Sequence, residues 1–161
     1  MQLGAAAAAI LATAGGVATF IRPGLERGHL SAGARQVFAS VGEAILDGSL
    51  PRGTARAPVL RAFLQRVDDL VRHLPQHAQA ELSQLLALLL TAPGRIALAG
   101  VHEDWPRANV GDVQKGLQAM RTSGSSLRRQ AYQALHDIAG AAYFADPATW
   151  AQLGYPGPRV L

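Results

Sequence analysis

The chain has 161 residues, of which 49% are hydrophobic and 16% are charged, with a net charge of +4 and a pI near 10.3. This length suits one domain of ordinary size. The absence of cysteine excludes disulfides, thiolate zinc sites, iron–sulfur clusters and covalent haem attachment.

The basic residues do not predict a nucleic-acid interface. All are arginine except Lys115, and apart from the pair Arg128-Arg129 most stand singly with acids between them. No aromatic platform is interleaved with them, so a solvated surface explains them better than nucleic-acid binding. The single arginines are Arg52, Arg56, Arg61, Arg66, Arg72, Arg95 and Arg107.

Residues 1–24 are predicted to be an export signal or a membrane anchor. Leu3 to Ile21 carries no charge, and Arg22 follows it. Its many alanines and glycines make this run weakly hydrophobic, which is closer to the h-region of an export signal than to a leucine-rich anchor. Only Met1 and Gln2 precede the run, so the basic residues that open a signal are missing.

Three interpretations of this segment remain open. In the first, the true start lies upstream and supplies basic residues, such as a twin-arginine pair, to a signal that is cleaved or retained. In the second, residues 3–21 form a single spanning or interfacial helix with Arg22 and Arg27 at its exit. In the third, they form a buried helix of the domain. The first two predict a bacterial protein that is periplasmic, exported or membrane-anchored.

Residues 31–161 are predicted to form an all-α domain, which residues 25–30 join to the N-terminal segment as a polar linker. Strand-forming residues are sparse, and no Val/Ile/Thr run alternates with polar residues over the length of a strand. Ser31 is placed to cap a first helix that ends at Asp47-Gly48, and a second amphipathic helix runs from Pro58 to Val71.

A leucine-rich helix after Pro75 is predicted to lie at the centre of a compact bundle. Its apolar residues cover almost every side, and burying a leucine is worth about 1.5–3 kcal/mol, so neighbours are expected on all faces. Those residues are Leu82, Leu85, Leu86, Leu88, Leu89 and Leu90.

Further helical segments follow in the carboxyl-terminal half. A short apolar turn is predicted from Arg95 to Gly100, and a further helix is predicted after Asn109. The serines from Ser123 onward begin a longer helix with one apolar stripe that reaches Tyr143. Asp146, followed by proline, predicts an N-cap for a short helix that carries Trp150.

The chain ends in an aromatic tail. Tyr155-Pro156-Gly157-Pro158 cannot continue a helix, because two prolines fix φ and remove backbone donors, so an extended strap is expected. Each large aromatic buries about 150–250 Å². The tail therefore either closes the core of this domain or sits in a groove on another protein.

Several polar groups are candidates for chemical sites. His73 and His77 have helical metal-ligand spacing, but Pro75 between them disrupts it. Adjacent residues of a helix point about 100° apart, so His136 and Asp137 do not face each other. His102-Glu103-Asp104 is interpreted as a solvated loop with Trp105 turned inward.

The chain is therefore predicted to have no catalytic, cofactor-binding or metal-binding residues. No GxGxxG, GxxxxGKS/T, HExxH or GxSxG motif occurs. An all-helical chain without such a motif, a thiol or an acid–base pair is typical of a binding or accessory subunit.

The carboxyl-terminal pattern resembles a known family. It comprises Tyr143-Phe144-Ala145-Asp146-Pro147, Trp150 and Leu153-Gly154-Tyr155-Pro156-Gly157-Pro158. It is similar to the small (gamma) subunits of membrane-associated flavoprotein dehydrogenases, including the gluconate 2-dehydrogenase subunit 3 family and the small subunits that accompany glucose-methanol-choline oxidoreductases. Looser agreement covers residues 46–51, 60–74 and 74–82.

The resemblance implies a non-catalytic helical subunit that binds the flavin-bearing large subunit and assists its maturation, folded export and complex assembly. It also implies a twin-arginine signal and, often, a cytochrome subunit in the complex. Partner-binding residues would be Tyr143, Phe144, Trp150, Tyr155 and Pro156. The alternative is an independent helical envelope protein that binds a ligand or protein in a groove between helices.

Overall fold

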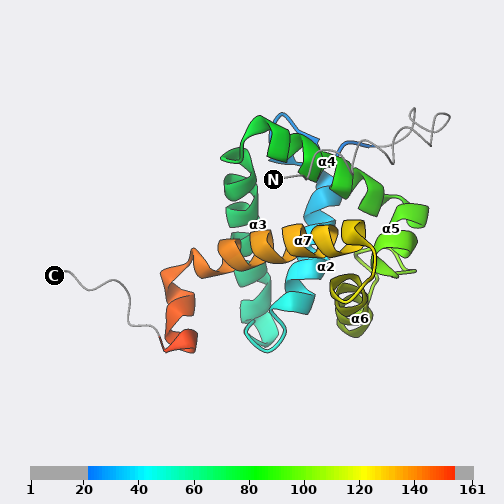
Figure 1. Cartoon of the computed structure of the whole chain (residues 1–161). Coiled ribbons are helices and arrows are strands. Elements are labelled where there is room, and N and C mark those ends of the chain that lie inside the picture. The colour runs from blue at the N-terminus through cyan, green and yellow to red at the C-terminus, as the bar shows by residue number, and fades with distance from the viewer. Residues whose placement is uncertain (1–21, 155–161) are drawn as a thin grey trace.

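The computed structural model describes residues 22–154, without the side chains of residues 151–153. This part of the chain is mostly helical, which confirms the all-α fold class (Figure 1). The residues 3–21 and the tail from Tyr155 onward lie outside the described residues. The helices are α2 (Ala32–Ile45), α3 (Arg56–Arg72), α4 (Gln76–Leu90), α5 (Ala92–Ala99), α6 (Val110–Arg121) and α7 (Ser126–Phe144), with 3-10 helices η1 (Gly53–Ala55) and η2 (Pro147–Leu153).

Most helices of residues 22–154 begin at a capping side chain, whereas α3 and α4 have none. The side chains of Ser31, Asn109 and Ser125 each accept a hydrogen bond from a backbone N–H in the first turn of α2, α6 and α7. Thr91 does the same for α5. The predicted apolar turn from residue 95 to residue 100 therefore lies mostly within this helix, and Gly100, with a φ of 67°, is its C-cap. Side-chain capping thus determines most helix starts.

The prediction that the leucine-rich helix lies at the centre is wrong, because α2 holds that position. α2 packs against α3, α4, α6 and α7, whereas α4 packs chiefly against α2 and α5. Glycines in α2 allow the close approach: a Cβ on Gly42 would lie 2.5 Å from the Phe63 ring, and one on Gly33 would lie 2.7 Å from Leu90. Small residues, which carry little hydrophobic signal, therefore mark the central helix.

Residues 25–30, predicted to be a linker, form a two-stranded antiparallel hairpin instead. Its strands are β1 (Leu25–Glu26) and β2 (His29–Leu30). Arg27 and Gly28 form the turn with φ values of 53° and 82°, which is the left-handed geometry of a two-residue hairpin. The hairpin contacts α3 and α4, so the packed region begins before Ser31.

Asp68 of α3 holds this hairpin in place. Its carboxylate accepts the N–H of Leu30 at 2.7 Å, pairs with His29 Nδ1 at 2.8 Å and lies 3.1 Å from Arg35 Nη2. Burial raises the pKa of Asp68, but the hydrogen bonds from His29 and Leu30 and the charge of Arg35 outweigh burial, so its pKa lies below the ordinary value. The charged form of Asp68 is thus the form that the fold favours.

Candidate functional site

Tyr143 and Phe144 end α7 with opposite exposure. Tyr143 is 2% exposed, and its hydroxyl donates a hydrogen bond to the carbonyl oxygen of Ser49 at 3.0 Å. Phe144 is 41% exposed, and its ring meets the Tyr143 ring edge-on at a centroid distance of 5.2 Å. Of these two predicted partner-binding residues, Tyr143 therefore belongs to the core and Phe144 to the surface.

Trp150 lies beside this pair. Its Nε1 donates to the carbonyl oxygen of Phe144 at 2.7 Å, and its side chain is half-buried. The predicted cap is confirmed, since Asp146 Oδ1 accepts the N–H of Ala148 at 3.0 Å, although the helix that follows is the 3-10 helix η2. We call Tyr143, Phe144 and Trp150 the aromatic end; the predicted residues Tyr155 and Pro156 lie outside the described residues.

Arg66 of α3 braces the aromatic end. Its Nε donates to the carbonyl oxygen of Ala142 at 2.7 Å, and its Nη1 lies 3.2 Å from Asp146 Oδ2. Its Nη2 is buried and has no hydrogen-bond partner within residues 22–154. The prediction that the single arginines are solvated is therefore wrong for Arg66. It is also wrong for Arg95, which is 4% exposed and lies 3.0 Å from Asp104.

The candidate polar groups lie on different elements, with His136 and Asp137 on α7 and His73 at the end of α3. His136 Nδ1 lies 3.4 Å from Asp137 Oδ1 on an exposed surface, so the prediction that these two side chains do not face each other is wrong. The Tyr132 ring stacks on the imidazole at a centroid distance of 5.4 Å. His73 Nδ1 contacts the carbonyl oxygen of Asp69 at 2.6 Å. Among residues 22–154, no group of three or more His, Asp or Glu side chains could hold a metal ion.

The loop before α6 has the predicted arrangement. Trp105 is 3% exposed, and its Nε1 donates to the carbonyl oxygen of Leu89 at 2.8 Å. His102 and Glu103 are exposed beside it. Trp105 thus has a structural role, and its inward orientation is confirmed.

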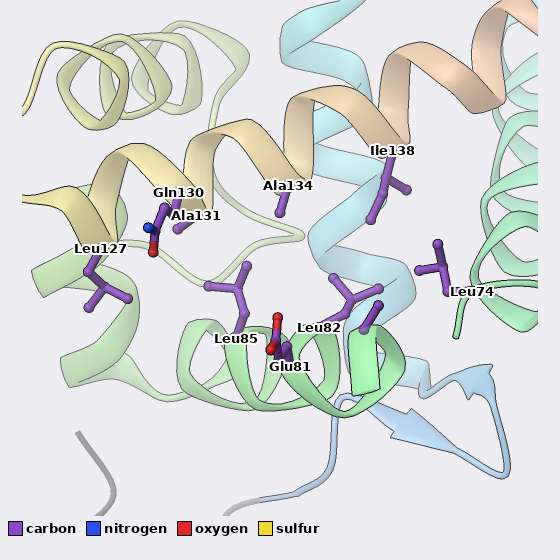
Figure 2. Close-up of a pocket in the computed structure, with 10 residues that line it drawn as sticks. Leu74, Glu81, Leu82, Leu85, Leu127, Gln130, Ala131, Ala134 and Ile138 are labelled. Carbon is purple, nitrogen blue, oxygen red and sulfur yellow. The ribbon is translucent and has the colours of Figure 1, made fainter. Parts of the chain in front are cut away.

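A groove lies between α4 and α7. The alternative hypothesis expected a groove between helices but did not place it on α4, because α4 was predicted to be covered on all sides. The groove has a volume of about 190 Å³ (Figure 2). Figure 2 shows side chains of both helices turned toward one another across it. Its lining is mainly aliphatic, with two polar side chains: Leu74, Ala78, Glu81, Leu82, Leu85, Leu127, Gln130, Ala131, Ala134 and Ile138. We call this feature the α4/α7 groove.

No family model, curated protein or solved structure matches this chain. Within residues 22–154, no single helix is long and apolar enough to cross a membrane. Taken together, α4 and α5 have the required length and composition, but they are bent by 103° relative to each other. Residues 22–154 thus expose apolar groups at the aromatic end, in the α4/α7 groove and at Ile96 on α5.

Proposed function

We propose that this chain is a non-catalytic accessory subunit that binds a flavin-dependent dehydrogenase large subunit of the glucose-methanol-choline type. In this role it assists the maturation of the flavoprotein, its export as a folded protein and the assembly of a membrane complex, in some cases with a cytochrome subunit. The observation that carries the proposal is the exposed Phe144 ring, 41% accessible, on a firmly packed support. It lies within the carboxyl-terminal pattern on which the family resemblance rests.

The aromatic end has the properties of an interface anchor. Aromatic side chains dominate the binding energy of protein interfaces when they enter a pocket on the partner. Phe144 is held from one side by the buried Tyr143, and its carbonyl oxygen accepts the indole N–H of Trp150. Because the Phe144 surroundings are already ordered, binding would cost little additional conformational entropy.

Co-purification tests this function. A tagged large subunit, expressed from a gene adjacent to that of this chain, is expected to retain the chain on an affinity column. In a strain that lacks this chain, the large subunit is expected to lose flavin content and to fail to reach the periplasm. A large subunit that folds, binds flavin and is exported normally in that strain would contradict the proposal.

The second candidate is an independent helical envelope protein that binds an apolar ligand or a protein segment. The α4/α7 groove favours it, because concave and mainly apolar sites with a few polar groups are typical of ligand binding. Native mass spectrometry of the purified chain tests it. A bound apolar molecule that is lost in a Leu85→Glu variant would support this candidate, and a ligand-free chain would count against it.

A further inference from the structure

The α4/α7 groove has no occupant among the described residues. We propose that it binds the apolar segment of this same chain, residues 3–21, in an intramolecular contact. The inference does not rest on the proposed function, because it follows from the groove, from the place where residue 22 joins the fold, and from the composition of the segment.

The point of attachment lies on α4, the helix that forms one wall of the groove, at Ser83 and Leu86, which do not line the groove. Gly24 packs so closely on α4 that an added Cβ would lie 2.5 Å from Leu86 Cβ and 2.6 Å from the carbonyl oxygen of Ser83. The N–H of Leu25 donates to Ser83 Oγ at 3.0 Å. Leu82 and Leu85, on the same helix, line the groove. The segment is therefore tethered to the helix that forms one groove wall.

The tether is long enough for the segment to reach the groove. An α-helix with its side chains is about 10–12 Å wide, so about five extended residues pass around α4. The remaining residues would span about 20 Å as a helix. The α7 wall, from Leu127 to Ile138, is about 17 Å long at 1.5 Å per residue. Length therefore permits the contact along the whole groove.

The chemistry of the two surfaces also matches. Residues 3–21 contain no charged side chain, and the run Ala5 to Ala9 offers a smooth surface of methyl groups. Ala78, Ala131 and Ala134 in the groove walls allow a backbone to approach closely. Thr13, which lies in the part of the segment beyond the connection, would supply a hydroxyl group for Glu81 or Gln130 in the groove lining.

Tethering favours this occupant over a free one. A short connection gives an effective concentration of about 1 mM, so a contact with a dissociation constant of about 0.1 mM is occupied about ten times more often than it is empty. The bound segment would be shielded from water and from other proteins while the domain is folded. A membrane or an export receptor would then have to displace it.

Thiol reactivity tests this proposal, because the chain has no cysteine and one introduced thiol is therefore unique. Ala134→Cys places the thiol in the groove wall. His136→Cys is the matched control, since two residues further along α7 a side chain points about 200° away. Each is made in the otherwise unchanged full chain and in a chain that also carries Ile10→Asp and Leu11→Asp. A chain with Ile10→Leu and Leu11→Ile controls for substitution as such.

We expect the thiol at residue 134 to react about tenfold more slowly in the full chain and the apolar control than in the Asp double variant. The rate at residue 136 should be the same in all three. Equal rates at residue 134 would overturn the proposal. Protection that increases with protein concentration would assign the groove to a second copy, and protection that survives the Asp substitutions would assign it to another ligand; either result overturns it. Gln130→Cys replaces Ala134→Cys if circular dichroism shows that the latter does not fold.

Discussion

The aromatic end and the α4/α7 groove both expose apolar groups, but they do so in opposite ways. At the aromatic end, Phe144 projects from a support that is fixed by Tyr143 and Trp150. In the groove, two helices that each pack on α2 leave a recess between themselves. The first is suited to enter a pocket on a larger partner, and the second is suited to receive an apolar segment. Exposed apolar groups therefore require separate explanations at the two places.

The largest expected effect is a difference in the free energy of unfolding between two variants of α4, one in the core and one in the groove wall. Leu86 is fully buried, whereas its neighbour Leu85 lines the groove. We expect Leu86→Ala to lower the free energy of unfolding by about 2–5 kcal/mol, because it leaves a cavity in a packed core. Leu85→Ala should lower it by about 1 kcal/mol or less, because less apolar area is buried there. Urea unfolding measures the difference when both variants are made in the chain that also carries Ile10→Asp and Leu11→Asp, so that residues 3–21 do not cover Leu85.

Equal losses of unfolding free energy in Leu86→Ala and Leu85→Ala would contradict this difference between core and groove wall. They would mean that Leu85 is as well packed as Leu86 and that the groove is closed in solution. Leu89→Ala, also at a fully buried position of α4, provides a second reference for the core.

The next effect is the pH dependence of stability that arises from Asp68, which holds the hairpin of residues 25–30 on α3. Because the pKa of Asp68 is lower in the folded protein, its contribution to stability is fully present above the ordinary pKa of about 3.9. It is lost as the pH falls through the lower folded-state value. At pH 7, Asp68→Asn should cost about 1.5–3 kcal/mol, the worth of hydrogen bonds to a charged group.

Chemical denaturation at pH 7 and at pH 2–3 tests this effect. The difference in unfolding free energy between the parent chain and Asp68→Asn should shrink on acidification. A difference that stays constant would show that the charge of Asp68 does not hold the hairpin on α3.

A smaller effect distinguishes two neighbouring rings at the aromatic end. Tyr143→Phe removes the hydroxyl that donates to Ser49 and should cost about 0.5–1.5 kcal/mol. Phe144→Ala should change the free energy of unfolding by no more than about 0.5 kcal/mol, because that ring is on the surface. Thermal unfolding of both variants gives the comparison. A large loss with Phe144→Ala would place that ring in the core and remove it as an anchor.

Local signals predicted the helices, but packing decided which of them is central. Apolar spacing and the caps Ser31, Asn109 and Ser125 give the helix boundaries, because both act within a few residues. The centrality of α2 depends on Gly42 approaching Phe63 across the bundle, which no local pattern encodes. The leucines of α4 predicted burial on all sides, but two of them, Leu82 and Leu85, line a groove instead.

The missed features depend on contacts between distant residues. The hairpin at residues 25–30 is held by Asp68, far along the chain, and its strands are too short to show alternation. The sequence predicted Arg66 to be one of several solvated arginines. In the structure it donates a hydrogen bond to the carbonyl oxygen of Ala142, next to the aromatic end. Of the predicted partner-binding residues, Tyr143 lies on the predicted apolar stripe and is buried, whereas Phe144 lies off that stripe and is exposed. The helical period therefore distinguished these two rings, because adjacent helical positions point in different directions.

The most direct measurement compares the binding of three forms of this chain to the purified flavoprotein large subunit by calorimetry or interferometry. Phe144→Ala is expected to weaken binding about tenfold or more, which is about 1.4 kcal/mol. Ile96→Ala is the matched control, because Ile96 on α5 is also 41% exposed, and its affinity should equal that of the parent chain. Equal affinities for all three forms, or no binding by the parent chain, would contradict the account.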